Sequence, residues 1–266
     1  MYGAILGDIV GSTYELHNVK TEQFELFPSG STFTDDTVLS VAVAAKILNE
    51  DKANMNARKS YALWYKQYYR KYPHAGFGQM FSSWALADHL FIQRSFGNGG
   101  AMRVSAIGFA CDSIPEIKKE VWNSCFYTHL HPEAIKGAQA IAIAIFMARK
   151  GCDKDEIKKY LSKKFRYRFH ATLEELRDTY VFNSRTSYTV PPALEAFFES
   201  NSYEDAIRKA VSIGGDSDTI ACMTGGIAQA YYKRIPPDLY NSGIRFLDSG
   251  LKMILKEFEE KYKIER

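Results

Sequence analysis

Apolar residues recur at the spacing of an α-helix over most of the 266-residue chain, and this periodicity limits the fold more than any other feature. Several of the periodic stretches are rich in alanine, which favours helix and lets helices pack closely. The clearest runs are Val38–Leu48, Ser60–Tyr69, Ala134–Ala148, Asp155–Lys164, Ala193–Phe198, Tyr203–Val211, Asp218–Tyr232 and Ile244–Tyr262. No β-branched run alternates with polar residues between two hairpin signals. The sequence therefore predicts an all-α, compact globule of many helices.

The breaks in this pattern are short segments that contain proline or glycine. They are Pro28 to Gly30, Pro73 to Gly78, Gly97 to Gly100, Pro191-Pro192, Gly214-Gly215 and Pro236-Pro237. None is long enough, or biased enough in composition, to be an interdomain linker, and no internal repeat is present. Because 46% of the residues are hydrophobic, the chain can build a large core. We expect one domain that spans residues 1–266.

The charge balance argues against several classes of partner. Lys and Arg number 34 against 31 Asp and Glu, so the net charge is only +3 and predicts neither nucleic-acid nor membrane-surface binding. The stretch 64–71 interleaves aromatic and basic residues, which can stack bases and grip phosphates. We interpret it instead as an amphipathic helix with its aromatic side chains inward and its lysines outward.

The chain also shows no sign of export. Its first residues lack a basic segment and reach Asp8 after a very short apolar run, which is typical of neither a signal peptide nor a membrane span. No CxxC spacing occurs, so we expect buried free thiols of a reducing compartment rather than a zinc site or disulfides. The four cysteines are Cys111, Cys125, Cys152 and Cys222. Together these features predict a cytoplasmic protein.

Two carboxylate-rich segments stand immediately before helical runs, namely Thr34 to Thr37 and Gly214 to Thr219. At a helix N-terminus, free backbone N–H groups and the helix dipole favour negative charge. One such residue is explained by helix capping. Asp216 and Asp218, however, lie two residues apart beside Thr219, a density of oxygen atoms that suits a hard cation such as Mg²⁺ or Mn²⁺. Spacing alone leaves capping and metal binding equally supported, whereas the lack of a nearby His or Cys disfavours zinc.

Taken with other motifs, these segments make the chain resemble the ADP-ribosylglycohydrolase family. That family includes the bacterial dinitrogenase-reductase-activating glycohydrolases and the animal ADP-ribosylarginine and ADP-ribosylserine hydrolases. The matching stretches follow the family's order and run from the start of the chain to Ala221. They are Gly3 to Glu15, Phe33 to Val38, Ser95 to Arg103, Thr128-His129 and Gly214 to Ala221. The resemblance implies an orthogonally packed all-α fold and a cleft that holds two Mg²⁺ or Mn²⁺ ions.

The resemblance also implies roles for individual residues. The metal ligands would be Thr34, Asp35 and Asp36 from the first junction, with Asp216, Asp218 and Thr219 from the second. Glu15 matches an acidic residue on a mobile loop that guards the metals and takes part in catalysis. Taken alone, Glu15 is equally explained as a solvated charge. We expect Glu15, Asp36 and Asp216 to be the catalytic residues.

Substrate contacts are expected from a glycine-rich turn and a histidine. Glycines would let backbone amides approach a diphosphate, although a flexible turn before a helix explains them as well. The resemblance assigns this role to Ser95, Phe96, Gly97, Asn98 and Gly99, with the ring of Phe96 on the adenine side. His129 matches a family histidine that contacts ADP-ribose, and is otherwise explained as a cap or core residue. We expect Arg103 to be structural, in a buried ion pair with Asp8.

The implied reaction is metal-dependent hydrolysis at the anomeric carbon of the ribose farther from adenine. Its substrate would be an ADP-ribosylated protein or a small ADP-ribose conjugate. The stretches that end at Glu15 and Arg103 favour an O-linked, serine-type substrate, with ADP-ribosylarginine as the alternative. Residues 183–188 lack a cysteine expected in bacterial relatives, which bears on preference if they line the cleft. A non-catalytic ADP-ribose-binding or crystallin-like protein, and a two-metal hydrolase of another bond, remain alternatives.

Overall fold

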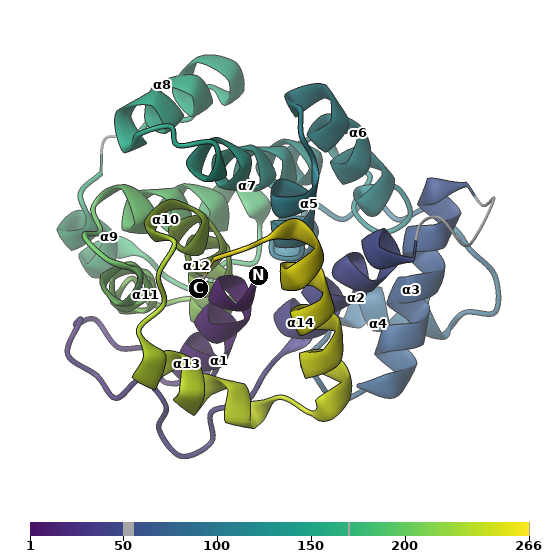
Figure 1. Cartoon of the computed structure of the whole chain (residues 1–266), viewed down its shortest axis with the longest axis horizontal. Coiled ribbons are helices and arrows are strands. Elements are labelled where there is room, and N and C mark those ends of the chain that lie inside the picture. Colours follow the sequence, from purple (N-terminus) through teal and green to yellow (C-terminus); the bar gives the residue numbers. More distant parts are fainter. Residues whose placement is uncertain (50–55, 170, 266) are drawn as a thin grey trace.

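The computed structural model describes residues 1–49, 56–169 and 171–265, which form helices joined by loops (Figure 1). Within these ranges extended backbone pairs only at two isolated bridges, Arg94 with His129 and Gly97 with Arg185. The prediction of an all-α fold is confirmed. The elements are α1 (Tyr2–Leu16), α2 (Asp35–Leu48), α3 (Ala57–Lys71), α4 (Gln79–Leu86), η2 (Asn98–Gly100), α5 (Ser105–Ala110), α6 (Ile114–Cys125), α7 (Pro132–Arg149), α8 (Lys154–Phe165), α9 (Leu173–Thr179), α10 (Thr186–Phe198), α11 (Tyr203–Ser212), α12 (Ser217–Tyr232), α13 (Pro237–Gly243), η3 (Ile244–Phe246) and α14 (Ser249–Tyr262).

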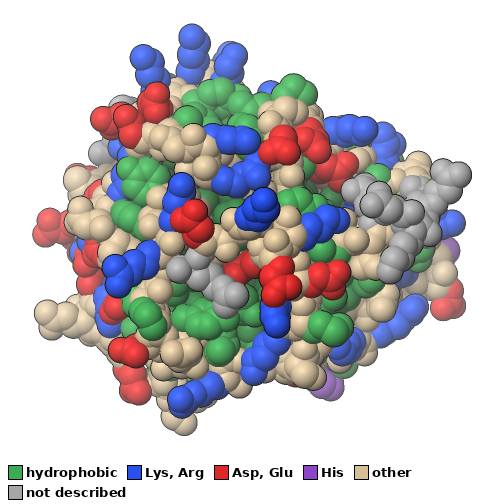
Figure 2. Space-filling model, in the orientation of Figure 1, with side chains coloured by type: hydrophobic (Ala, Val, Ile, Leu, Met, Phe, Trp, Pro, Cys, Tyr) green, Lys and Arg blue, Asp and Glu red, His purple; other side chains and the backbone are tan. Residues whose placement is uncertain are grey.

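Helix α12 forms the centre of the molecule. Every residue from Ser217 to Ala230 is buried, as expected for a helix that is apolar on all sides. It packs against α1, α7, α10 and α11, and Figure 1 shows α1 in the interior with the other helices around it. On the face drawn in Figure 2, positive and negative side chains are intermingled. No described helix has the length and apolar character needed to cross a bilayer.

A stripe of glycines on α1 allows an unusually close approach to α12. Gly3, Gly7 and Gly11 are spaced four residues apart and therefore share one face of the helix. A Cβ atom on Gly7 would lie 2.1 Å from the carbonyl oxygen of Ala221, and one on Gly11 would lie 2.5 Å from the Cα of Asp218. Both contacts are with backbone, which cannot rotate away. The stripe therefore fixes the end of α1 beside the start of α12.

Two sequence predictions about helix boundaries are wrong. Pro191-Pro192, expected in a loop, lies inside α10. Pro192 has no N–H group and cannot donate the helical hydrogen bond to the carbonyl oxygen of Tyr188. That oxygen instead accepts from the hydroxyl of Tyr180 at 3.3 Å. The run expected over residues 244–262 is divided into η3 and α14, because Asp248 caps α14 by accepting from the Leu251 N–H at 2.8 Å.

The predictions for the cysteines and for residues 64–71 are confirmed, with one exception each. All four cysteines are free thiols, but Cys152 is only half-buried. Residues 64–71 are helical, and Tyr65, Tyr68 and Tyr69 are buried as expected. Lys66, however, is also buried, and its ammonium donates to the carbonyl oxygens of Ala87 and His89. A lysine with backbone acceptors within reach does not need to face solvent.

Replacement of Gly7 with alanine should destabilise the protein strongly, because the added methyl group collides with the backbone of α12. We expect Gly7→Ala to lower the free energy of unfolding by about 3 kcal/mol. Urea denaturation followed by circular dichroism measures this change. The matched control is Gly78→Ala, where a Cβ meets nothing within 4 Å, and we expect it to stay within about 1 kcal/mol of wild type. Equal stabilities of the two variants would contradict the close-approach argument.

Candidate metal centre

The two carboxylate segments meet at the N-termini of α2 and α12. Thr34 is the N-cap of α2, and Asp35 and Asp36 occupy its first turn. Asp216 is the N-cap of α12, and Asp218 lies in that first turn. The two ends are joined directly, because the hydroxyl of Thr219 donates to Asp36 Oδ2 at 3.1 Å. The loop-to-helix junctions predicted from the sequence are therefore present and adjacent.

Asp8 fastens the start of α2 to α1. Its carboxylate accepts from the backbone N–H and hydroxyl of Thr34 at 2.9 and 2.7 Å, and from the N–H of Thr37 at 3.1 Å. The predicted ion pair between Arg103 and Asp8 is wrong. Arg103 instead donates to the carbonyl of Ser124 at 3.0 Å and to the hydroxyl of Thr128 at 2.8 Å, with its guanidinium over the ring of Tyr65. Thr34 and Thr37 thus supply the hydrogen bonds that Asp8 was expected to obtain from Arg103.

Glu15 reaches the same cluster from the last turn of α1. Two sets of carboxylate oxygens lie within 4.8 Å of one another: those of Asp8, Asp36 and Asp218, and those of Glu15, Asp216 and Asp218. The expected mobile loop around Glu15 is a helical turn in this structure, because α1 continues to Leu16. Helix formation here depends on packing against α12, which local sequence does not reveal.

The electrostatics of the cluster favour a bound cation. Burial, reinforced by repulsion from Asp8 and Asp216, raises the pKa of Asp35 to about 8. Burial and carboxylate neighbours also raise the pKa values of Glu15, Asp36 and Asp218. Buried Asp36 Oδ1 has no hydrogen-bond partner. None of the described residues that line the surrounding cleft is Lys or Arg. Clustered anionic oxygens with an unsatisfied acceptor fit a hard divalent ion.

The cluster forms one wall of a cleft of about 460 Å³, a volume typical of small-molecule sites. The glycine-rich turn forms another wall: Asn98 Nδ2 donates to Asp216 Oδ2 at 2.7 Å, and Ser95 Oγ accepts from the Gly97 N–H at 3.1 Å. Gly99 contacts the His129 ring so closely that a Cβ there would lie 2.9 Å from Nε2. Ser95, Gly97, Asn98 and Gly99 therefore line the cleft.

Phe96 does not line the cleft. Its side chain is 47% exposed, and it contacts the Arg185 guanidinium at 4.7 Å and the His131 ring at 5.9 Å. Arg185 in turn forms an ion pair with Glu133 at 2.8 Å, which fixes the cation over the ring. The structure thus places Phe96 outside the cavity that its neighbours line.

His129 is a neutral residue of the cleft wall. Arg103 donates to the hydroxyl of Thr128, and that hydroxyl oxygen lies within hydrogen-bond distance, 2.9 Å, of His129 Nδ1. Burial lowers the pKa of His129 well below its ordinary value, so the ring is uncharged at neutral pH. Nε2 is the ring nitrogen beside Gly97 and Gly99. A tautomer with its proton on Nε2 would present one N–H group to the cleft.

Several cleft residues were not identified from the sequence. Met80, Gln79, Gln93, Phe182 and Ser184 line the cavity, and no spacing or motif distinguishes them. In the sequence, the segment 183–188 is distinguished only by the lack of a cysteine. Its first part does face the cleft, because the carbonyl of Ser184 accepts from the Asn98 N–H at 2.8 Å.

Comparison with known proteins shows the family of this chain. The sequence model of the ADP-ribosylglycohydrolase family matches residues 1–256. The chain belongs to the ADP-ribosylglycohydrolase family. The expectation of this family and its enzyme class is therefore confirmed.

Curated relatives of this ADP-ribosylglycohydrolase match most of its length. ADP-ribosylhydrolase ARH3 of Mus musculus is 27% identical, covering 86% of this chain and 82% of that protein. ADP-ribosylarginine hydrolase Tri1 of Pseudomonas putida is 25% identical, covering 90% of this chain and 71% of that protein. A solved structure described as an ADP-ribosylglycohydrolase-related protein complex shares the fold, with a TM-score of 0.70 at 21% identity over 99% of this chain and 95% of that one.

The raised carboxylate pKa values predict how the metal-free protein responds to pH. A folded state with raised pKa values retains protons that the unfolded chain has lost, so stability falls as pH increases towards about 8. Between pH 6.5 and 8 in chelator, we expect the free energy of unfolding to fall by about 1–2 kcal/mol. This window lies above the ordinary pKa of histidine, so the lowered pKa of His129 does not oppose the trend.

Urea denaturation at several pH values measures this slope. The control is Asp35→Asn, which removes the titrating group and should flatten the slope. Added Mn²⁺ should stabilise the wild type more at pH 8 than at pH 6.5, because the ion binds the ionised form. A wild-type stability that stays constant or rises over this window would contradict the raised pKa values.

Proposed function

We propose that the protein hydrolyses the glycosidic bond between ADP-ribose and a protein side chain or other acceptor, with two Mg²⁺ or Mn²⁺ ions and an O-linked, serine-type substrate preferred. The observation that supports this proposal is that the carboxylates of Asp36, Asp216 and Asp218 gather beside Glu15 in a cleft that Asp35 also lines. Family membership supplies the class of substrate.

The residues fit distinct tasks in such a reaction. Asp35, Asp36, Asp216 and Asp218, with Thr34 and Thr219, would hold the ions. Bound divalent cations would orient the ribose hydroxyls and lower the pKa of a water molecule. Glu15 has a raised pKa and reaches the cluster from outside the two helix N-termini, so it suits proton transfer to the leaving group or from water.

Neutral donors would bind the ADP-ribose itself. His129 would offer an Nε2 N–H, and Ser95 can donate its hydroxyl proton because its oxygen already accepts from Gly97. Backbone at Gly97 and Gly99 approaches the cavity without a side chain in the way. Phe96, with Arg185 over its ring, lies next to this turn and would contact the adenine only at the rim.

The nature of the leaving group favours an O-linkage. A serine alkoxide needs a proton as it departs, and burial raises the pKa of Glu15 in the direction that suits a general acid. An ADP-ribosylated guanidinium already carries its proton, so it departs as a neutral guanidine and needs less acid assistance. An N-linked substrate is the alternative, since the relative Tri1 is named for ADP-ribosylarginine.

Removal of one aspartate should abolish metal binding and hydrolysis together. We expect Asp218→Asn to lower turnover by a factor of about 10³ or more, because the ions lose a ligand while the side-chain shape is preserved. Release of ADP-ribose from serine-linked and arginine-linked peptides, with Mg²⁺ and with chelator, measures activity; calorimetric titration with Mn²⁺ measures binding. Fold is checked by circular dichroism.

The matched control is Asp112→Asn, an exposed carboxylate outside the cleft that should leave all values unchanged. Wild-type turnover in Asp218→Asn would overturn the metal assignment. Tight binding of ADP-ribose by the wild type without hydrolysis of either peptide would indicate a binding protein. Release of inorganic phosphate would indicate a hydrolase of a different bond.

A further inference from the structure

The exposed side chain of Asn18 links the end of α1 to the turn before α12. Its Nδ2 donates to the carbonyl oxygens of Tyr14 and Glu15 at 2.8 and 2.9 Å, and lies 3.4 Å from that of Gly215. Its Oδ1 accepts from the Gly215 N–H at 2.5 Å. One amide group therefore joins the turn that carries Glu15 to the residue that precedes Asp216.

The backbone on the α12 side is shaped to receive this amide. Gly214 and Gly215 have φ values of 76° and 72°, a conformation that favours glycine. A Cβ on Gly214 would lie 2.9 Å from Asn18 Oδ1 and 3.0 Å from Lys20 Nζ. Lys20 adds a second tie, since its ammonium donates to the carbonyls of Ile213 and Tyr180 at 2.7 and 2.8 Å.

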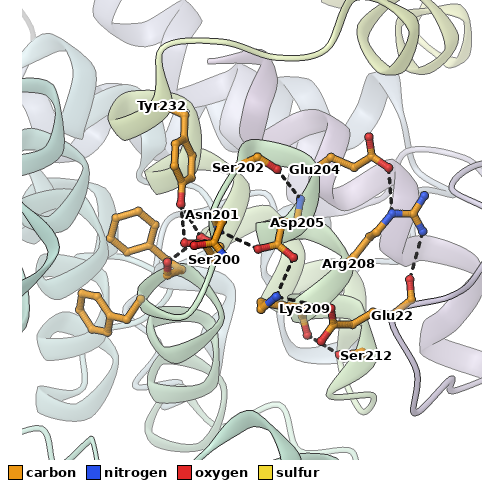
Figure 3. A network of polar contacts seen from close by, with 12 residues as sticks. Glu22, Ser200, Asn201, Ser202, Glu204, Asp205, Arg208, Lys209, Ser212 and Tyr232 are labelled. Atoms are coloured by element: carbon orange, nitrogen blue, oxygen red, sulfur yellow. Dashed lines mark hydrogen bonds and ion pairs between the residues drawn. The ribbon is translucent and has the colours of Figure 1, made fainter.

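The chain beyond Asn18 is anchored independently. Glu22 pairs with Lys209 at 3.4 Å and with Arg177, and its carbonyl accepts from Arg208 at 3.1 Å. Figure 3 shows Arg208 and Lys209 reaching Glu22 from α11, each also held by an acidic neighbour. These contacts fix the loop to the body of the protein, but none of them reaches Glu15.

The link lies where carboxylates crowd together. The carboxylates of Glu15 and Asp216 lie close enough to share a cation. Repulsion between them acts against the close approach of the end of α1 to α12, and a tie at this point opposes that repulsion. The Asn18 amide is neutral, so it joins the two segments through their backbones without adding charge to the cluster.

We propose that Asn18 is a positioning residue that sets the distance between the carboxylates of Glu15 and Asp216. The catalytic part of this inference rests on the proposed function, because it assigns proton transfer to Glu15. The structural part, the tie between α1 and Gly215, does not. The competing explanation is that Asn18 only caps α1 and contributes stability.

Asn49 provides a matched control for that explanation. It follows α2, and its Nδ2 donates to the carbonyl of Ala45, four residues earlier, at 2.8 Å. Asn18 makes the same bond to Tyr14, but Asn18 also bonds to Gly215 in the turn before α12. Asn49→Ala therefore measures the loss of an equivalent helix-end hydrogen bond without any effect on Glu15.

Hydrogen exchange tests the tie directly, with the full chain and no substrate. In Asn18→Ala, we expect amides in the peptide that covers residues 213–217 to exchange about tenfold faster, because the Gly215 N–H loses its acceptor. Asn49→Ala should leave this peptide unchanged. Unchanged exchange at residues 213–217 in Asn18→Ala would overturn the proposal, whether or not the protein is a hydrolase.

Kinetics then test the role in catalysis. We expect Asn18→Ala to lower kcat about tenfold with KM changed less than about twofold, since a displaced Glu15 impairs the chemical step more than binding. In a Glu15→Gln background, Asn18→Ala should cause no further loss of kcat. An independent, additive loss would show that Asn18 acts through stability. If the wild type lacks activity, the proposed function fails. The hydrogen-exchange result still tests whether Asn18 links α1 to Gly215.

Discussion

The close packing of α1 against α12 is the constraint on which the site depends. The two helices run antiparallel, so that Gly3 faces Gly225, Gly7 faces Ala221 and Gly11 faces Asp218. The next step of four residues along α1 is Glu15, which comes opposite the turn at Gly214-Gly215. The glycine stripe therefore places the end of α1, and with it Glu15, beside the first turn of α12. Wider spacing would separate Glu15 from Asp216 and Asp218.

This packing assembles a cluster that opposes folding. Several carboxylates are removed from water close to one another, and burial of unpaired charge is among the most destabilising features a protein can carry. Part of the cost is offset locally: Asp8 accepts from Thr34 and Thr37, and Asp216 accepts from Asn98. Asp36 Oδ1 remains without a partner. A fold that keeps such a cluster trades stability for the capacity to hold cations.

The sequence predicts those parts of the structure that are determined locally. Apolar periodicity identified the long helices, and carboxylates before helical runs identified both junctions. The sequence analysis did not predict α1 as a helix, because Gly3, Gly7 and Gly11 lower helix propensity. These glycines are explained only by their close contact with α12 in the folded protein. For the same reason Asn18, whose partner Gly215 is 197 residues away in the sequence, carried no signal.

The position of Arg103, which differs from the prediction, leaves the carboxylate cluster without a neutralising arginine. Arg103 is fully buried, and an ion pair with Asp8 would place a permanent positive charge among the carboxylates. That charge would lower their pKa values and occupy the electrostatic role of a metal ion. Instead, its guanidinium lies over Tyr65 and donates to Ser124 and Thr128, where it orients His129. Because Arg103 lies on the histidine side of the cleft, its charge does not neutralise the carboxylates, and the cluster could hold a cation.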